Sequence, residues 1–224
     1  MIRSKKQGLL IVVSGPSGAG KDSVCNQLLA KNTNIWESIS VTTRPKRPLE
    51  KDGIHYFFTD YETFEKRIEQ NDFLEYAKFN DHYYGTPKSN INEKLNAGID
   101  VLLVIEIQGA LKIKELYDKA LFIFILPPSM AELKRRLEKR GTESEAKILS
   151  RFQRAYQEIN ELTKYNYVVV NDTIEVAADK IEAIITAEKC RVDRIEEVYL
   201  NSPEEVLHEK LIQNKTFHNE KIDL

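Results

Sequence analysis

The chain has 224 residues, with 33 Lys and Arg against 35 Asp and Glu, so its formal net charge is −2. This length suits one sizeable α/β domain with small insertions, and the balance of charge argues against a broad nucleic-acid or membrane footprint. The two cysteines, Cys25 and Cys190, are far apart and predict no disulfide framework. No apolar run approaches the ~20 residues that span a bilayer, and we expect a cytoplasmic protein.

Continuous apolar runs predict the strands of a core sheet. They occupy residues 9–14, 101–107, 121–126 and 167–170. Unbroken apolar character is typical of parallel strands that are buried on both faces. A helical pattern follows each run, as βαβ units require. The sequence therefore predicts an α/β fold with a central parallel sheet flanked by helices.

Residues 35–97 differ from this pattern because they are rich in Thr, Tyr, Phe, Pro and Arg, with turn points at Gly53 and Gly85. This composition predicts a small mixed or antiparallel insertion between the first helix and the second core strand. The last stretch, at about 200–224, is polar and weakly patterned, and we assign it no function.

Residues 14–24, SGPSGAGKDSV, match a phosphate-binding loop placed between a predicted strand and a predicted helix. Gly15, Gly20 and Lys21 supply the skeleton of G-x-x-x-x-G-K-[ST]. In such loops the backbone N–H groups and the helix N-terminus bind the β-phosphate, and the lysine lies between the β- and γ-phosphates. The residues expected to bind a nucleoside triphosphate are Gly15, Pro16, Ser17, Gly18, Ala19, Gly20, Lys21, Asp22 and Ser23.

Asp22 stands where this loop normally carries the Ser or Thr that ligates Mg²⁺. A carboxylate is a hard oxygen ligand and can bind Mg²⁺ itself. It can equally face outward, because the helix dipole favours an acidic residue in the first turn, and Ser23 then supplies the hydroxyl. We favour the second arrangement, and both residues stay candidates for the metal site.

The insertion carries signs of a site for a second anion. Arg44 and Arg47 are spaced to converge on one anion, and adjacent prolines limit the freedom of their backbone. Planar guanidinium groups suit a phosphate monoester, to which Tyr56 can add a hydroxyl donor. Glu75 is an acidic residue in an aromatic setting.

Motifs along the chain resemble those of the guanylate kinase family in order and spacing: GPSGAGK, SVTTRPKRPLEKDGIHY, FLEYAKF, YYGTP, IEIQG, LPPS and RLEKRGTESE. The resemblance covers about residues 8–190. It implies a three-layer P-loop NTPase fold, a monophosphate-binding insertion, a mobile lid, and Mg²⁺-dependent transfer of the ATP γ-phosphate to GMP. The corresponding division of the chain is a core at 1–34 and 98–199, a lid at about 136–151, a GMP-binding insertion at 35–97 and a tail at 200–224.

The resemblance also implies roles for residues of the insertion. Glu75 and Thr86 match positions that read guanine, whose N1–H and N2 amino group can both donate to one carboxylate. Adenine lacks this edge and would leave a buried carboxylate unpaired. The implied GMP-binding residues are Ser40, Arg44, Arg47, Glu50, Tyr56, Glu75, Tyr84, Thr86 and Glu106.

Two polar residues are expected at the ends of core strands. Glu106 is expected to end a buried strand near the phosphate loop, and it matches a family acid associated with GMP and the metal. Many members carry a second acid where this chain has Val104, which weakens the case for a two-carboxylate metal shell. Asn171 matches a position that meets the ATP base, and a plain Asn-Asp helix cap fits Asn171 and Asp172 almost as well.

The expected chemistry needs no strong general base, because the acceptor is already an anionic phosphate oxygen. Arg136 and Arg140 lie four residues apart on one predicted helix, Arg151 follows, and all three match family arginines that close over the phosphates. Arg135 and Arg154 are interpreted as solvated helix charges. The expected catalytic residues are Lys21, Arg136, Arg140 and Arg151.

Other functions fit the sequence less well. Peptide-binding guanylate-kinase-like domains typically lack an intact phosphate loop and lid arginines, which are present here. Glu75 and Thr86 argue against a sugar phosphate as acceptor, and no N-K-x-D motif indicates a GTPase. The expected partners are therefore ATP and GMP, without nucleic acid or membrane, and a homodimer stays open.

Overall fold

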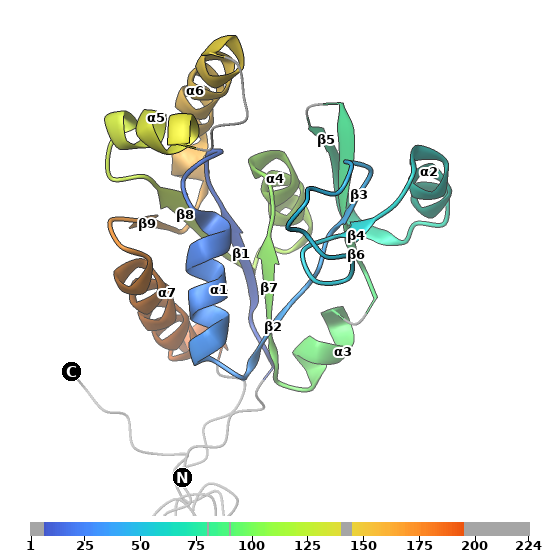
Figure 1. Cartoon of the computed structure of the whole chain (residues 1–224). Helices are drawn as coiled ribbons and strands as arrows, with labels where there is room; N and C mark the ends of the chain where they lie inside the picture. Colours follow the sequence, from blue (N-terminus) through green and yellow to red (C-terminus); the bar gives the residue numbers. More distant parts are fainter. Residues whose placement is uncertain (1–6, 80, 90, 140–144, 195–224) are drawn as a thin grey trace, which may run out of the picture.

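The computed structural model describes residues 7–79, 81–89, 91–139 and 145–194 of the chain. Two β-sheets and the helices around them make up this part of the molecule (Figure 1). The predicted polar tail lies outside the described residues.

The core is a five-stranded parallel sheet with the strand order β2-β7-β1-β8-β9. Its central strands are almost wholly buried, as their continuous apolar runs predict. The predicted α/β class and central parallel sheet are confirmed. The strands are β1 (Leu10–Ser14), β2 (Ile35–Glu37), β7 (Asp100–Val104), β8 (Leu121–Leu126) and β9 (Tyr167–Val170).

Two details of the core sheet differ from the expectation. β2 falls in the range expected to form the insertion, yet it pairs with β7 in the register Ile35↔Asp100. Its three half-buried residues are too few to show an apolar run. β7 ends at Val104 rather than at residue 107, because Glu106 is already the N-cap of helix α4 (Ile107–Leu116).

Helices cover both faces of the core sheet (Figure 1). Helices α1 (Lys21–Lys31) and α7 (Ile174–Lys189) pack on one face, against Ile11 and the other side chains of β1 that point the same way. Helices α3 (Ile91–Asn96) and α4 pack on the opposite face, against Val12. Because strand side chains alternate between the two faces, β1 contributes to both apolar clusters and is buried throughout.

The second sheet is four-stranded, mixed, and ordered β4-β3-β6-β5. β3 is parallel to β4 and antiparallel to β6, which is antiparallel to β5. Helix α2 packs on this sheet. The elements are β3 (Val41–Thr42), β4 (Phe57–Phe58), α2 (Tyr61–Glu69), β5 (Phe73–Phe79) and β6 (His82–Pro87).

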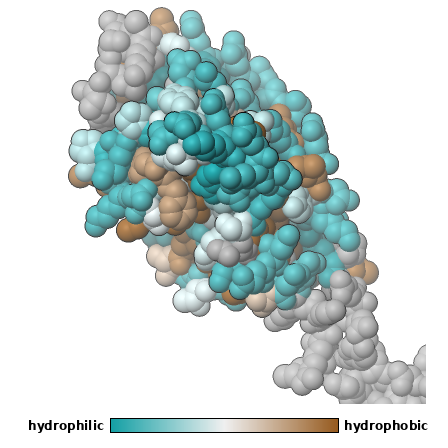
Figure 2. Space-filling view, turned by 90° about the vertical axis from the view of Figure 1, so that its right-hand side faces the viewer, coloured by the Kyte–Doolittle hydropathy of each residue, from teal (hydrophilic) through white to brown (hydrophobic). Residues whose placement is uncertain are grey.

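An aromatic stack holds the second sheet to its helix. Phe64 of α2 is fully buried, with its ring centroid 4.5 Å from that of Phe73 and 5.1 Å from that of Tyr83. Asp60 caps α2 by accepting a 2.7 Å hydrogen bond from the N–H of Thr63. The surface on this side of the molecule is mainly hydrophilic, with scattered apolar residues (Figure 2). No helix in the described ranges is long and apolar enough to cross a membrane.

Helices α5 (Met130–Lys139) and α6 (Glu145–Ile159) rise above the end of the core sheet where β1 and β8 finish (Figure 1). They pack on each other through a small buried cluster that includes Leu133, Leu137 and Ala155. The ligand crevice of an open α/β sheet lies beyond the carboxyl ends of its strands, so this helix pair stands beside the expected site.

Asp100, at the start of β7, joins the segment before β1 to the end of α7. Its carboxylate accepts hydrogen bonds from the Leu9 N–H (2.9 Å) and from the Lys189 ammonium group (2.5 Å). The Asp100 side chain is 2% exposed, whereas the Asp179 side chain, which pairs with Lys31 on the surface, is 58% exposed.

We expect Asp100→Ala to lower the free energy of unfolding by roughly 2 kcal/mol, because it leaves a buried N–H without an acceptor. Asp179→Ala is the matched control and should cost less than about 1 kcal/mol, since exposed ion pairs contribute little. Urea unfolding of both variants measures the difference. Equal losses in the two variants would contradict this account of Asp100.

Candidate functional site

The phosphate loop follows β1 at the carboxyl edge of the sheet and leads directly into α1. Lys21 turns back over the loop and donates a 2.8 Å hydrogen bond to the Gly15 carbonyl oxygen. Gly20 precedes α1 with a φ of 92°, and a Cβ added there would lie 2.4 Å from Asn171 Nδ2. Only glycine suits that backbone conformation and that close approach.

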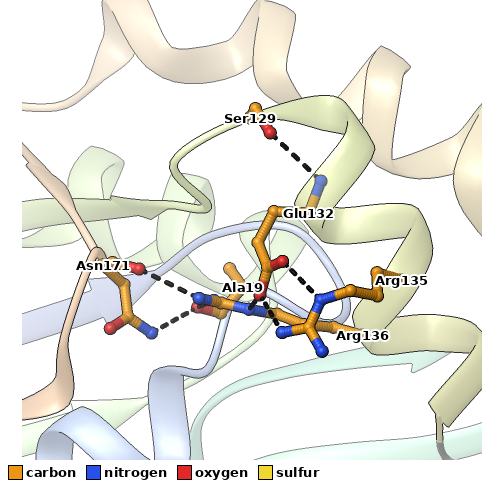
Figure 3. Close-up of polar contacts among 6 residues, drawn as sticks. All are labelled: Ala19, Ser129, Glu132, Arg135, Arg136 and Asn171. Atoms are coloured by element: carbon orange, nitrogen blue, oxygen red, sulfur yellow. Dashed lines mark hydrogen bonds and ion pairs between the residues drawn. The ribbon is translucent and has the colours of Figure 1, made fainter.

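The Ala19 carbonyl oxygen joins the loop to two other segments (Figure 3). It accepts hydrogen bonds from Asn171 Nδ2 (2.8 Å) and from Arg136 Nη1 (3.2 Å). Arg136 Nη2 in turn donates to the Asn171 carbonyl oxygen at 3.1 Å. The loop, helix α5 and the segment after β9 are therefore held at one point.

Asn171 does not cap the helix that follows it. The N-cap of α7 is Thr173, whose side chain accepts from the Val176 N–H, so the helix-cap interpretation of Asn171 was wrong. Asn171 is buried, and its Oδ1 has no hydrogen-bond partner among the described residues. A buried acceptor of this kind suits a ligand that donates a hydrogen bond.

Glu132 orients Arg136 from one turn earlier in α5 (Figure 3). It accepts hydrogen bonds from Arg136 Nε (2.8 Å) and from Arg135 Nε (2.6 Å). The hydrogen bonds from Arg135 and then Arg136 lower the pKa of Glu132 to about 2, so it stays ionised. A groove of about 550 Å³ opens beside these residues. Its lining includes Gly18, Gly20, Ser23, Glu132, Arg135, Arg136 and Asn171.

Helix α6 also reaches the phosphate loop. Arg151 Nη2 donates a 2.7 Å hydrogen bond to the Ser17 hydroxyl oxygen. Of the expected catalytic residues, the structure thus brings Lys21, Arg136 and Arg151 to the loop, while Arg140 lies outside the described residues.

Asp22 and Ser23 face different surroundings. Ser23 lines the groove beside Asn171. After burial, the charge of Asp22 is the largest cause that raises the pKa of Glu37 in β2, and likewise that of Tyr56. Among the described residues, no three His, Cys, Asp or Glu side chains are grouped as a metal site.

Glu75 lines a small pocket between the two sheets. It is 7% exposed, and its Oε1 accepts a 2.8 Å hydrogen bond from the Thr86 hydroxyl, opposite it in the β5–β6 register. Burial raises the pKa of Glu75, against the smaller effects of Thr86 and of the Lys112 charge. The pocket is lined by Ser40, Tyr56, Glu75, Ala77, Tyr84, Gly85, Val104, Ile105, Glu106 and Gly109.

Gly109 is a member of this site that the sequence interpretation missed. A Cβ at Gly109 would lie 2.6 Å from Glu75 Oε2, so α4 can approach the carboxylate only because this residue has no side chain. The signal was a glycine inside a predicted helix, which often marks a close approach.

The Arg44 side chain is held beside the same pocket. Its Nη2 donates to Glu50 Oε1 at 2.7 Å, and its guanidinium lies 5.4 Å from the centre of the Tyr56 ring. Arg47 is exposed, with its Nη1 4.0 Å from the same Glu50 oxygen. Glu50 is partly buried, which raises its pKa, but Arg44 and the Arg47 N–H outweigh burial and lower it. The two arginines therefore gather on one anion, the Glu50 carboxylate.

Two interpretations of charged residues need correction. Glu106 does not end a strand but is the N-cap of α4, and it lines the pocket that holds Glu75. Arg154 is not a solvated charge: its guanidinium lies 3.8 Å from the centre of the Phe79 ring, and its Nε donates to Glu158 Oε1 at 2.9 Å. The i,i+4 spacing of Arg154 and Glu158 was the available signal.

Comparison with known proteins gives one consistent result. The guanylate kinase family profile matches residues 7–188. A guanylate kinase of Clostridium tetani is 57% identical over 92% of this chain and 99% of its own length, and one of Caldanaerobacter subterraneus is 57% identical over 90% and 98%. The crystal structure of guanylate kinase from Anaplasma phagocytophilum superposes with a TM-score of 0.75 at 35% identity, covering 95% of this chain and 97% of that one. The chain therefore belongs to the guanylate kinase family.

Proposed function

We propose that this chain transfers the γ-phosphoryl group of ATP to GMP, giving ADP and GDP, with Mg²⁺ as cofactor. The observation that carries the proposal is the buried Glu75 carboxylate, which lies in a pocket on the acceptor side of the phosphate loop. Family membership supports the reaction, and the contacts of individual side chains support the residue roles given below.

Guanine recognition rests on Glu75 and Thr86. Thr86 donates to Glu75 Oε1, which orients the carboxylate so that N1–H and the N2 amino group of guanine can donate to it. Burial makes ionisation of Glu75 costly without a ligand, and two donors on guanine offset this cost. Adenine has an acceptor at N1 and leaves the cost uncompensated.

The GMP phosphate is assigned to Arg44 and Arg47, in the segment between β3 and β4. Arg44 and Arg47 both approach the Glu50 carboxylate, which supports a role for the pair at a shared anion. Tyr56 and Tyr84 lie together beside Arg44, with ring centroids 6.0 Å apart, and can add hydroxyl donors. The remaining residues assigned to GMP are Ser40, Glu50 and Glu106.

ATP is assigned to the phosphate loop, residues 15–23, with its base near Asn171. The unpartnered Oδ1 of Asn171 can accept from the adenine 6-amino group. Lys21, Arg136 and Arg151 reach the loop, and with Arg140 they would neutralise charge on the transferred phosphoryl group. An anionic phosphate oxygen is the nucleophile, so positioning and charge neutralisation suffice.

We assign Mg²⁺ to Asp22 rather than to Ser23, which reverses the arrangement favoured from sequence. Ser23 lines the groove beside Asn171, whereas the Asp22 charge raises the pKa of Tyr56, a residue that lines the Glu75 pocket. A single carboxylate suits Mg²⁺, which binds through one or two carboxylates together with substrate phosphates. When bound, Mg²⁺ neutralises charge on the β- and γ-phosphates. The homodimer and the cytoplasmic location stay predictions.

Acceptor specificity tests the proposal directly. We expect kcat/KM for GMP to exceed that for AMP or CMP by roughly 10⁴-fold, because the buried carboxylate is left unpaired by the other bases. An assay that couples ADP release to NADH oxidation measures all three acceptors with ATP in excess. Equal values for GMP and AMP would exclude the guanine assignment.

Glu75→Gln should stabilise the protein while weakening GMP binding. Because burial raises the pKa of Glu75 above its unfolded value, the protonated carboxyl stabilises the fold below the unfolded pKa, and this contribution is lost as pH rises through the folded pKa. At neutral pH the glutamine variant should therefore gain roughly 1 kcal/mol, with GMP affinity lowered by about 100-fold.

Denaturant unfolding across pH and calorimetry with GMP measure the two effects of Glu75→Gln. The control is Glu62→Gln at an exposed position of α2, which should change neither quantity. A destabilised Glu75→Gln variant at neutral pH would contradict the expected cost of the buried charge.

The magnesium assignment predicts different effects at two neighbouring positions. Asp22→Ala should raise the Mg²⁺ concentration for half-maximal activity by roughly 10-fold, whereas Ser23→Ala should leave it nearly unchanged. Titration of Mg²⁺ at saturating GMP and ATP measures both. The reverse ranking would return the metal to Ser23.

A further inference from the structure

Helix α6 contacts the second sheet through Arg154. The guanidinium carbon of Arg154 lies 3.8 Å from the centre of the Phe79 ring, within the range of a strong cation–π contact. Phe79 is the last residue of β5, four residues after Glu75 in the same strand. The contact therefore joins α6 to the strand that carries the guanine-reading residue.

The same face of α6 contacts the phosphate loop. Arg154 donates to Glu158 Oε1 (2.9 Å), and Glu158 Oε2 accepts from the Ser17 N–H at 3.4 Å. Arg151 donates to the Ser17 hydroxyl at 2.7 Å. A continuous series of contacts thus runs from Phe79 through Arg154 and Glu158 to Ser17.

The Arg154–Glu158 pair is not an ordinary surface ion pair. The two side chains are 33% and 12% exposed, and they line a groove of about 760 Å³ between α4, α6 and the end of β5. Burial and then the charge of Glu106 raise the pKa of Glu158, while Arg154 and Lys21 oppose them. A partly buried carboxylate next to another acid costs stability, which the contacts with the loop and with Arg154 offset.

We propose that Arg154 and Glu158 are positioning residues that link the GMP-binding sheet to the phosphate loop and align the two. This inference rests on the proposed function, since it assigns the two residues to alignment of acceptor and donor. Neither side chain needs to touch the reacting atoms. Their effect is on how well the acceptor oxygen lines up with the γ-phosphate, and a misplacement of 1 Å can cost about 100-fold in rate.

A double-mutant cycle on Arg154 and Phe79 tests the inference. Arg154→Ala and Phe79→Leu should each lower kcat by about 10-fold and should leave the affinity for each nucleotide alone within about twofold. The double variant should be no slower than Arg154→Ala, because Phe79→Leu removes the ring on which Arg154 stacks and keeps an apolar side chain beside Tyr84. Arg154→Lys should recover part of kcat, since the ammonium group still pairs with Glu158 and stacks more weakly.

A matched control lies within the second sheet. The Arg67 guanidinium lies 4.8 Å from the centre of the Phe73 ring, and its Nε donates to Asp72 at 2.8 Å. This arginine–aromatic–carboxylate group joins α2 to β5 but does not reach the loop. Arg67→Ala should therefore lower Tm while leaving kcat unchanged. For a similar loss of Tm, Arg154→Ala should lower kcat by far more than Arg67→Ala does.

The outcomes separate the inference from the proposed function. Unchanged kcat in Arg154→Ala, or additive losses in the double variant, would overturn the positioning role although wild-type protein phosphorylates GMP. A wild-type protein that does not phosphorylate GMP would instead reject the proposed function. The same cycle measured on the free energy of unfolding without nucleotides tests the Arg154–Phe79 contact itself, and strict additivity there would overturn it independently of activity.

Discussion

The hydrogen bonds to the Ala19 carbonyl oxygen are the constraint on which the donor side depends. Asn171 and Arg136 reach this one atom from segments that follow different core strands. Asn171 can do so only because Gly20 has no side chain, since a Cβ there would lie 2.4 Å from Asn171 Nδ2. The parallel sheet behind the loop brings these strand ends to one edge, so the buried core determines where the arginine and the asparagine can meet.

The acceptor side depends on the free-energy cost of ionising a buried carboxylate, Glu75. Glu75 is buried where ionisation is unfavourable, held by Thr86 and approached by the backbone of α4 at Gly109. A ligand that brings further donors to this carboxylate is favoured over one that brings none, which is how a buried carboxylate gives selectivity. In our account α6 connects this side with the donor side through Arg154. The binding energy of GMP at the second sheet can then help to align its phosphate with the ATP γ-phosphate.

Much of this arrangement can be predicted from local sequence patterns. The apolar runs specify strands buried on both faces, and the spacing of Gly15, Gly20 and Lys21 specifies a loop that binds phosphate. β2 was not predicted because the strand has only three residues, Ile35–Glu37. They are half-buried and too few to give a periodic signal. The number and order of the core strands could not be read without it.

The side chains that connect distant segments could not be predicted. Glu158 and Ser17 are 141 positions apart, and helical periodicity does not say which neighbour a polar face meets. Arg154 looked solvated for the same reason. The effect of the Asp22 charge on Glu37 and Tyr56 could not be predicted either, because it depends on how the fold brings separate segments together.

The most direct measurement of the central claim is a crystal structure with GMP and a non-hydrolysable ATP analogue bound together. Our account predicts that guanine N1–H and N2 lie against the Glu75 carboxylate, that the triphosphate occupies residues 15–23, and that the GMP phosphate faces the γ-position in line. GMP bound away from Glu75, or a triphosphate bound outside the loop, would contradict it.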